Sequence, residues 1–195
     1  MRLVVDLSSA RLEMDPFPFS VVPDALCDGV ERATLSWFER AAPWSLTEES
    51  FYSQHEFDMR DVKLPSDVTQ LAADTTVTAL RDLISGLFRR RLRTTVDVIA
   101  HRLTAGQRIR IHDDYLEGGE THRLVVQLNR GWTPGDGGQL LLFGGGQPED
   151  VRVVLAPVSK QALIFEISRC SHHAVSKVAR GERYSIVYSF HAADR

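Results

Sequence analysis

The sequence predicts an α+β protein in which two helices precede an antiparallel β-barrel or jelly roll. A first helix is expected to open at residues 23 and 24, and a second to run over about residues 66–91, because apolar residues recur there at helical spacing. From Thr95 the character changes to short β-branched or alternating runs separated by Gly-rich turns, which is typical of a sandwich or barrel. These runs are VDVIAHRL, RIRIH, RLVVQLN, QLLLF, VRVVL, QALIF and YSIVYSF.

The 195 residues contain no internal repeat and no low-complexity linker, so we expect one domain over residues 1–195. Residues 1–94 are expected to give mainly helical support, with a short strand at 17–22 and an irregular stretch with one extended piece over 41–65. Residues 95–191 are expected to form the jelly-roll core. The arginine run at 89–93 is interpreted as a solvated helix end favoured by the macrodipole, with a docking patch for an acidic partner as the alternative.

Composition excludes several classes of protein. A net charge of −3 argues against a general nucleic-acid binder, and the longest apolar runs are too short to cross a bilayer. The first residues, MRLVVDLSSARLEMD, contain no apolar core of signal-peptide length. Cys27 and Cys170 form no Cys-x-x-Cys pair. We therefore expect a protein of the reducing cytoplasm, with neither nucleic acid nor membrane as its partner.

One of the seven histidines starts a His-x-Asp motif, His112-Asp113-Asp114. A strand turns successive side chains to opposite faces, so on a strand His112 and Asp114 share a face and Asp113 points away. That spacing lets an imidazole and a carboxylate bind one metal. The motif alone is weak evidence, because it arises often by chance.

A second imidazole is available at His172-His173, just after the predicted strand QALIF. Two imidazoles and one carboxylate on one face of a metal leave three positions open, an arrangement that suits iron(II) oxygen chemistry. An ordinary polar loop is the alternative interpretation of this histidine pair.

Arg183 lies ten residues beyond His173, on a predicted strand where Arg183 and Ser185 share one face. A buried, unpaired charge is very costly, so an arginine that faces a barrel interior must meet an anion. A planar guanidinium suits a carboxylate, and a neighbouring hydroxyl can add a hydrogen bond. An intramolecular pair with Glu166 is the alternative.

The segment from about residue 101 to 190 resembles the prolyl-hydroxylase-like branch of the 2-oxoglutarate and iron(II) oxygenases. The resemblance rests on the order and spacing of HDD, LVVQLNRGW, GGQLLLF, LAPVSKQALIF and HHAVSKVARGERYSI, with weaker likeness in PFPFSVVPDAL and FYSQHEF. It implies a double-stranded β-helix (jelly-roll) barrel with N-terminal supporting helices.

The resemblance also implies roles for particular residues. His112, Asp114 and His173 match the metal ligands and hence the catalytic centre, and Arg183 with Ser185 matches the pair that binds the far carboxylate of 2-oxoglutarate. The chain departs from the family at two positions, where many relatives have an aromatic residue and this sequence has Arg102 and Gln127. We count both as candidate contacts to 2-oxoglutarate, and Arg102 alternatively as a contact to an acidic substrate.

The implied activity is hydroxylation of an unactivated C–H bond, with release of succinate and CO2, by an Fe(II)/2-oxoglutarate-dependent dioxygenase with ascorbate as a possible reductant. The substrate implied is a prolyl or other aminoacyl or peptidyl group, free or within a peptide, with the loop at 115–122, Lys177 and Arg180 as candidate contacts. Two alternatives stay open. One is a cupin-like metal enzyme that does not use 2-oxoglutarate, and the other is a noncatalytic barrel that binds a small carboxylate.

Overall fold

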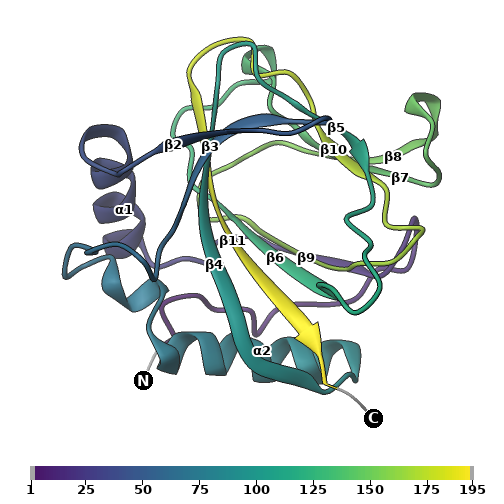
Figure 1. The fold of residues 1–195 in the computed structure, drawn as a ribbon, viewed down its shortest axis with the longest axis horizontal. Coiled ribbons are helices and arrows are strands. Elements are labelled where there is room, and N and C mark those ends of the chain that lie inside the picture. Colours follow the sequence, from purple (N-terminus) through teal and green to yellow (C-terminus); the bar gives the residue numbers. More distant parts are fainter. Residues whose placement is uncertain (1–2, 194–195) are drawn as a thin grey trace.

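Two antiparallel sheets face each other in the computed structural model, which describes residues 3–193 (Figure 1). The larger sheet contains, in spatial order, β1 (Phe19–Val22), β9 (Ala162–Glu166), β6 (His122–Gln127), β11 (Glu182–Ala192), β4 (Leu92–Thr104), β3 (Ser53–Asp58) and β2 (Ser45–Glu48). The smaller sheet contains β5 (Ile109–His112), β10 (His173–Val175), β7 (Leu140–Phe143) and β8 (Val151–Leu155). This two-sheet jelly roll is the architecture that the sequence predicts.

Both helices, α1 (Asp28–Arg40) and α2 (Asp74–Phe88), lie outside the barrel and cover the outer face of the larger sheet (Figure 1). Their buried side chains, such as Phe38 and Ile84, pack against outward-facing residues of β4 and β11 in one continuous apolar cluster. Burial of large apolar side chains contributes roughly 1.5–3 kcal/mol each, so this layer is the main support of the sheet. Within residues 3–193 no helix combines the length and the apolar character needed to cross a bilayer.

The second helix is shorter than the sequence predicts. Its first part is a separate 3-10 turn, η1 (Thr69–Leu71), and its end is fixed at Arg89, which adopts a left-handed φ of 52°. The chain then enters β4 at Leu92, so the arginine run forms a tight helix-to-strand turn and no basic residue lies in the last helical turn. A left-handed residue is a common way to end a helix, but it is usually glycine or asparagine, which explains why this end was misplaced.

The strand content also differs from the sequence prediction in two places. The N-terminal part contributes the expected strand β1 at one edge of the larger sheet, and two strands, β3 and β2, at the other edge where one extended piece was expected. The strands β2 and β3 are polar and lack an apolar run, so the sequence pattern does not resolve them. All seven runs predicted beyond Thr95 become strands. The strand that was missed, β10, has three residues, too few to show alternation.

Between the two sheets the interior is divided. One part is apolar, formed by Val125, Leu142, Leu163, Phe165 and Val187 from four different strands. Several other inward positions on β4, β6 and β11 carry polar or charged side chains, among them His101, Arg123, Arg183 and Ser185. The two remaining 3-10 turns, η2 (Pro134–Asp136) and η3 (Pro148–Asp150), lie in the connections before and after β7.

Candidate active site

His112 and His173 face each other directly across two neighbouring strands. They are register partners on β5 and β10, and their ring centroids lie 4.2 Å apart. Directly opposed residues on antiparallel strands have their Cβ atoms about 4.5–5.5 Å apart, so the pairing itself brings the two imidazoles together. The ring of Phe165 packs at 4.9 Å from the His173 ring.

The backbone selects the same tautomer for both rings. Nδ1 of His112 lies 2.8 Å from the carbonyl oxygen of Arg110, and Nδ1 of His173 lies 2.8 Å from that of Ser171. A carbonyl oxygen can only accept, so each Nδ1 carries the proton and donates it. This leaves the lone pair of each Nε2 free, which is the usual state of a metal-ligating histidine.

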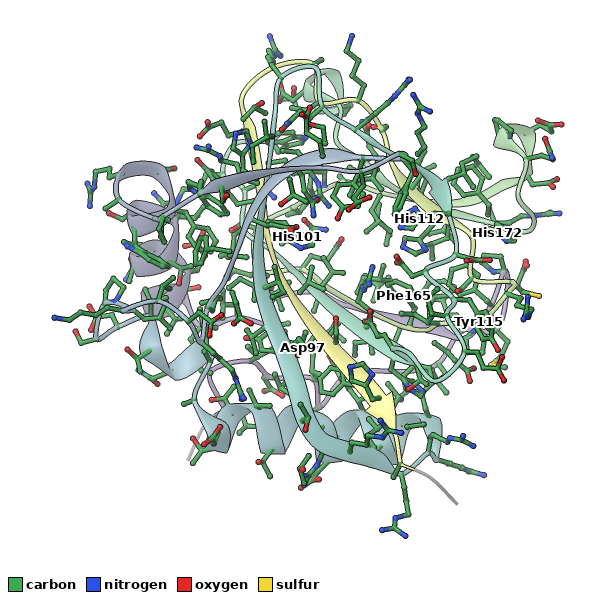
Figure 2. All side chains as sticks on the ribbon, in the orientation of Figure 1. Asp97, His101, His112, Tyr115, Phe165 and His172 are labelled. Atoms are coloured by element: carbon green, nitrogen blue, oxygen red, sulfur yellow. The ribbon has the colours of Figure 1, made fainter. Side chains whose placement is uncertain are left out.

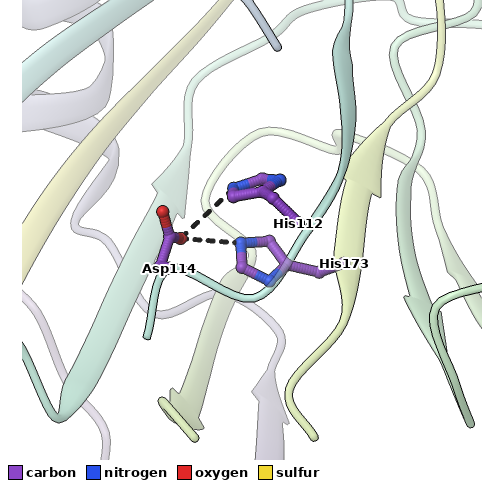
Figure 3. A group of neighbouring side chains, drawn as sticks. All are labelled: His112, Asp114 and His173. Carbon is purple, nitrogen blue, oxygen red and sulfur yellow. Dashed lines mark ion pairs between the residues drawn. The ribbon is translucent and has the colours of Figure 1, made fainter. Parts of the chain in front are cut away.

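A carboxylate oxygen completes the group (Figure 3). Oδ2 of Asp114 lies 3.3 Å from Nε2 of His112 and 3.0 Å from Nε2 of His173. Ligand atoms at about 2.1 Å from one metal, and at right angles to each other, lie about 3.0 Å apart. The three ligand atoms lie within 4.8 Å of one another. Two lone pairs and an anionic oxygen that converge in this way fit a shared divalent cation.

Asp114 does not reach this position by strand alternation. The strand β5 ends at His112, and Asp114 has a left-handed φ of 57°. Asp113 accepts a hydrogen bond of 3.0 Å from the Tyr115 N–H and is thereby turned elsewhere. His172 lies farther out than His112 (Figure 2). As expected, the side chain of Asp114 faces the two histidines and that of Asp113 does not. The cause is the conformation of a loop and not the alternation of side chains along a strand.

Arg123 contacts the Asp114 carboxylate from β6. Its Nη1 donates to Oδ2 of Asp114, while Nε and Nη2 donate to the two carboxylate oxygens of Glu120 at 3.0 and 2.5 Å. Burial alone would raise the pKa of Asp114, but the charge of Arg123 beside its carboxylate opposes this and helps to hold that pKa well below its usual range. The sequence analysis missed Arg123 and Glu120, because neither belongs to a motif.

Arg183 is buried inside the barrel without a carboxylate partner among residues 3–193. Its Nε donates to the carbonyl oxygen of Gly138 at 2.9 Å, and its Nη2 has no partner. Burial lowers the pKa of Arg183 to about 10, so the guanidinium stays charged at neutral pH. The alternative pair with Glu166 does not form. An unpaired buried cation with a free N–H group is strong evidence for an anionic ligand.

A row of polar side chains crosses the larger sheet beside Arg183. His101 on β4, Ser185 on β11 and Gln127 on β6 are register partners and therefore point to the same face. Oε1 of Gln127 is buried without a partner. Burial, together with the charges of Arg123 and Arg183, lowers the pKa of His101 to about 3, so this imidazole is neutral. Figure 2 shows His101 and His112 on opposite sides of the space between the sheets.

The placement of Arg102 corrects the expectation that it faces the barrel interior. Its guanidinium lies 5.2 Å from the centroid of the Trp44 ring, and Nη1 lies 3.5 Å from Oε1 of Glu182, both on the outer side of the sheet. The inward position on β4 belongs to its neighbour His101.

Two aromatic residues next to the metal ligands were also missed. Phe51, in the turn between β2 and β3, has its ring 4.8 Å from that of His112, and Tyr52 forms a β-bridge with Ile109. Burial and the nearby carboxylates, including Asp114, raise the pKa of the Tyr52 hydroxyl. This turn therefore borders the site. The candidate substrate contact Arg180, in contrast, is engaged in an ion pair with Asp136.

Comparison with known proteins agrees with this arrangement. Residues 98–191 match the model of the 2OG-Fe(II) oxygenase superfamily. Over 101 residues the chain is 33% identical to the prolyl 3-hydroxylase OGFOD1 of Xenopus laevis, a match that covers 50% of this chain and 20% of that protein. The chain thus spans about a fifth of the length of the curated relative that it matches.

Two solved structures share the fold. A prolyl-4-hydroxylase from Pseudomonas putida superimposes with a TM-score of 0.74 at 23% identity, covering 90% of this chain and 93% of that one. A prolyl hydroxylase from Trichoplax adhaerens, in complex with a hypoxia-inducible-factor oxygen degradation domain peptide, gives 0.74 at 17% identity over 89% and 83% of the two chains. At these identities the likeness shows the double-stranded β-helix fold.

Members of this family use Fe(II) and 2-oxoglutarate, and the residues present here fit both groups. The matched region contains the His112–Asp114–His173 group and the unpaired Arg183. Residues 98–191 are therefore similar to the 2OG-Fe(II) oxygenase superfamily, and the chain shares the fold of two prolyl hydroxylases.

Proposed function

We propose that this chain is a 2-oxoglutarate-dependent dioxygenase that hydroxylates an unactivated C–H bond and releases succinate and CO2. The observation that carries the proposal is the free Nη2 of Arg183, buried in the same cavity as the imidazoles of His112 and His173. A cupin-like metal enzyme has no need for an unpaired cation there. Its presence beside a metal-binding group favours a dicarboxylate cosubstrate over the alternatives.

In this proposal His112, Asp114 and His173 would hold Fe(II). The bound metal would supply the oxidation chemistry, and the chain supplies position and exclusion of water. Arg183 binds the distal carboxylate of 2-oxoglutarate, and the hydroxyl of Ser185 and the amide of Gln127 add hydrogen bonds beside it. The neutral imidazole of His101 takes the inward position that we had assigned to Arg102.

For the substrate we propose a prolyl or other aminoacyl group, free or within a peptide. The prolyl hydroxylases to which the chain is similar support this class, and the peptide bound to the Trichoplax adhaerens protein supports a peptidyl form. Phe51 and Tyr52 border the metal group and offer ring surfaces that could pack against such a side chain.

We further propose that the protein works in the cytoplasm. Both cysteines, Cys27 and Cys170, are free thiols in the structure, which suits a reducing compartment. The net charge of −3 supports a small-molecule or peptide partner over nucleic acid, and we propose no role for a membrane.

The test is formation of succinate from 2-oxoglutarate with Fe(II) and ascorbate, first alone and then across a panel of free amino acids and proline-containing peptides. We expect basal turnover that a matching substrate stimulates. Binding of 2-oxoglutarate without any succinate, over the whole panel, would instead identify a noncatalytic carboxylate-binding barrel. Metal binding without 2-oxoglutarate binding would favour the cupin-like alternative.

A further inference from the structure

The ligand Asp114 lacks the support that the two histidines have. His112 and His173 are fixed by strand pairing and by hydrogen bonds from Nδ1 to backbone carbonyls. Asp114 lies beyond the end of β5 with a left-handed backbone, a conformation that residues other than glycine adopt only occasionally. Interactions from elsewhere in the fold must therefore hold its carboxylate in place.

Arg123 contacts that carboxylate, and Glu120 holds Arg123. One edge of the guanidinium is occupied by Glu120, which accepts from Nε at 3.0 Å and from Nη2 at 2.5 Å. The planar, forked geometry then directs Nη1 toward Oδ2 of Asp114, with which it forms an ion pair. The side chains of Arg123, Glu120 and Asp114 are only 20%, 13% and 17% exposed, so solvent screens these pairs weakly.

We propose that Arg123, anchored by Glu120, is a positioning residue that keeps Oδ2 of Asp114 where it can share a cation with the two imidazoles. This inference rests on the proposed function, since the cation is the metal of that site. A lone guanidinium would also repel a metal ion. Here Glu120 cancels its charge, so the Glu120–Arg123 pair is neutral as a unit, and the orienting effect on Asp114 decides the outcome.

Orientation of Asp114 and repulsion of the metal ion predict opposite changes in metal affinity when the guanidinium is removed. If orientation dominates, removing the guanidinium weakens metal binding, by about 10–100-fold for residues that hold a ligand in place. If repulsion dominates, removing the guanidinium tightens metal binding. A variant that changes orientation but not net charge separates the effects, and the chain offers one in the double variant Glu120→Gln/Arg123→Gln. Its amide pair is neutral, as the native ion pair is, but has no cation for Asp114.

The experiment is a calorimetric titration of the metal-free full-length chain with Mn(II). Wild type is compared with Arg123→Gln, with the double variant and with Arg123→Lys, and far-UV circular dichroism checks that each variant is folded. We expect Mn(II) binding to be weakened about 10–100-fold in the double variant and in Arg123→Gln. We expect weakening in Arg123→Lys as well, because an ammonium group lacks the planar fork. Unchanged or tighter binding in the double variant overturns the inference.

Two further measurements keep the result interpretable. The visible spectrum of the Co(II)-substituted protein reports the ligand set, and we expect the Arg123 variants to shift it toward the spectrum of Asp114→Ala. If the glutamine variants do not fold, Arg123→Lys decides, and wild-type Mn(II) affinity in that variant overturns the inference. If wild type binds no Mn(II), or if His173→Ala binds it as wild type does, the metal site itself is wrong. If Mn(II) binding is lost in His173→Ala but unchanged in the Arg123 variants, the metal site stands and only the positioning role of Arg123 is refuted.

Discussion

The two halves of the candidate site are built in different ways. The polar row, which we define as His101, Ser185 and Gln127 together with Arg183, lies on three adjacent strands of one continuous sheet. Its geometry follows from strand pairing alone. The metal group of His112, Asp114 and His173 takes two ligands from strands and one from a loop. Regular pairing thus fixes the part that would bind the cosubstrate, whereas the loop residue Asp114 is contacted by Arg123, nine residues further along the chain.

This difference predicts that the loop ligand is the most sensitive point of the site. Asp114→Ala removes the carboxylate from the metal group, and we expect succinate formation to fall by orders of magnitude because the metal carries the reaction. Asp113→Ala removes an adjacent, chemically identical side chain whose contact is the Tyr115 N–H, and we expect near-normal turnover. Rates of succinate release with Fe(II) measure both. The reverse ranking would transfer the ligand role to Asp113.

The polar row is tested by Arg183→Leu. Loss of a desolvated charge-assisted pair costs about 2–5 kcal/mol, so binding of 2-oxoglutarate should weaken at least tenfold while Mn(II) binding stays close to wild type. Calorimetric titration with 2-oxoglutarate in the presence of Mn(II) gives both values. Normal 2-oxoglutarate affinity would mean that Arg183 has a structural role. The polar row would then not be the cosubstrate-binding half of the site.

A subtler change tests how Arg183 is positioned. A Cβ at Gly138 would meet Cδ of Arg183 at 3.0 Å and Cζ2 of Trp132 at 3.2 Å, on a backbone with φ of +66°. We expect Gly138→Ala to weaken 2-oxoglutarate binding several-fold in the same titration, because Arg183 must shift. Gly131→Ala is a matched control, since Gly131 has φ of +61° and nothing within 4 Å. Equal loss in both variants would assign the effect to backbone strain.

The smallest effect is expected at Arg102. Arg102→Leu removes the same charge as Arg183→Leu, but from the outer face of the sheet, where Arg102 lies over Trp44. We expect 2-oxoglutarate affinity within about twofold of wild type, and a loss of stability of about 0.5–2 kcal/mol from the partly buried cation–π contact. Thermal unfolding and the same titration measure these. A large loss of 2-oxoglutarate affinity would instead indicate that the Arg102 side chain faces the barrel interior.

Most of the fold could be predicted from the sequence, because alternation and helical spacing are local properties of the chain. The inward direction of Arg183 and Ser185 follows from the apolar side chains that alternate with them on β11, such as Tyr184 and Ile186. On β4 both His101 and Arg102 are polar, so the pattern contains no signal for which one faces inward. Only pairing with β11 decides it, since Ser185 lies opposite His101.

The sequence by itself determined which residue types could form a metal group and an anion site, and the strands that carry most of them. The tertiary structure decided how Asp114 reaches the metal group, because its left-handed backbone and its contact with Arg123 involve a loop that no periodicity describes. It also decided that, among residues 3–193, Arg183 meets no carboxylate and its Nη2 has no partner. The partners available to Arg183 come from segments far apart in the chain, and their positions are set only once both sheets have packed against each other.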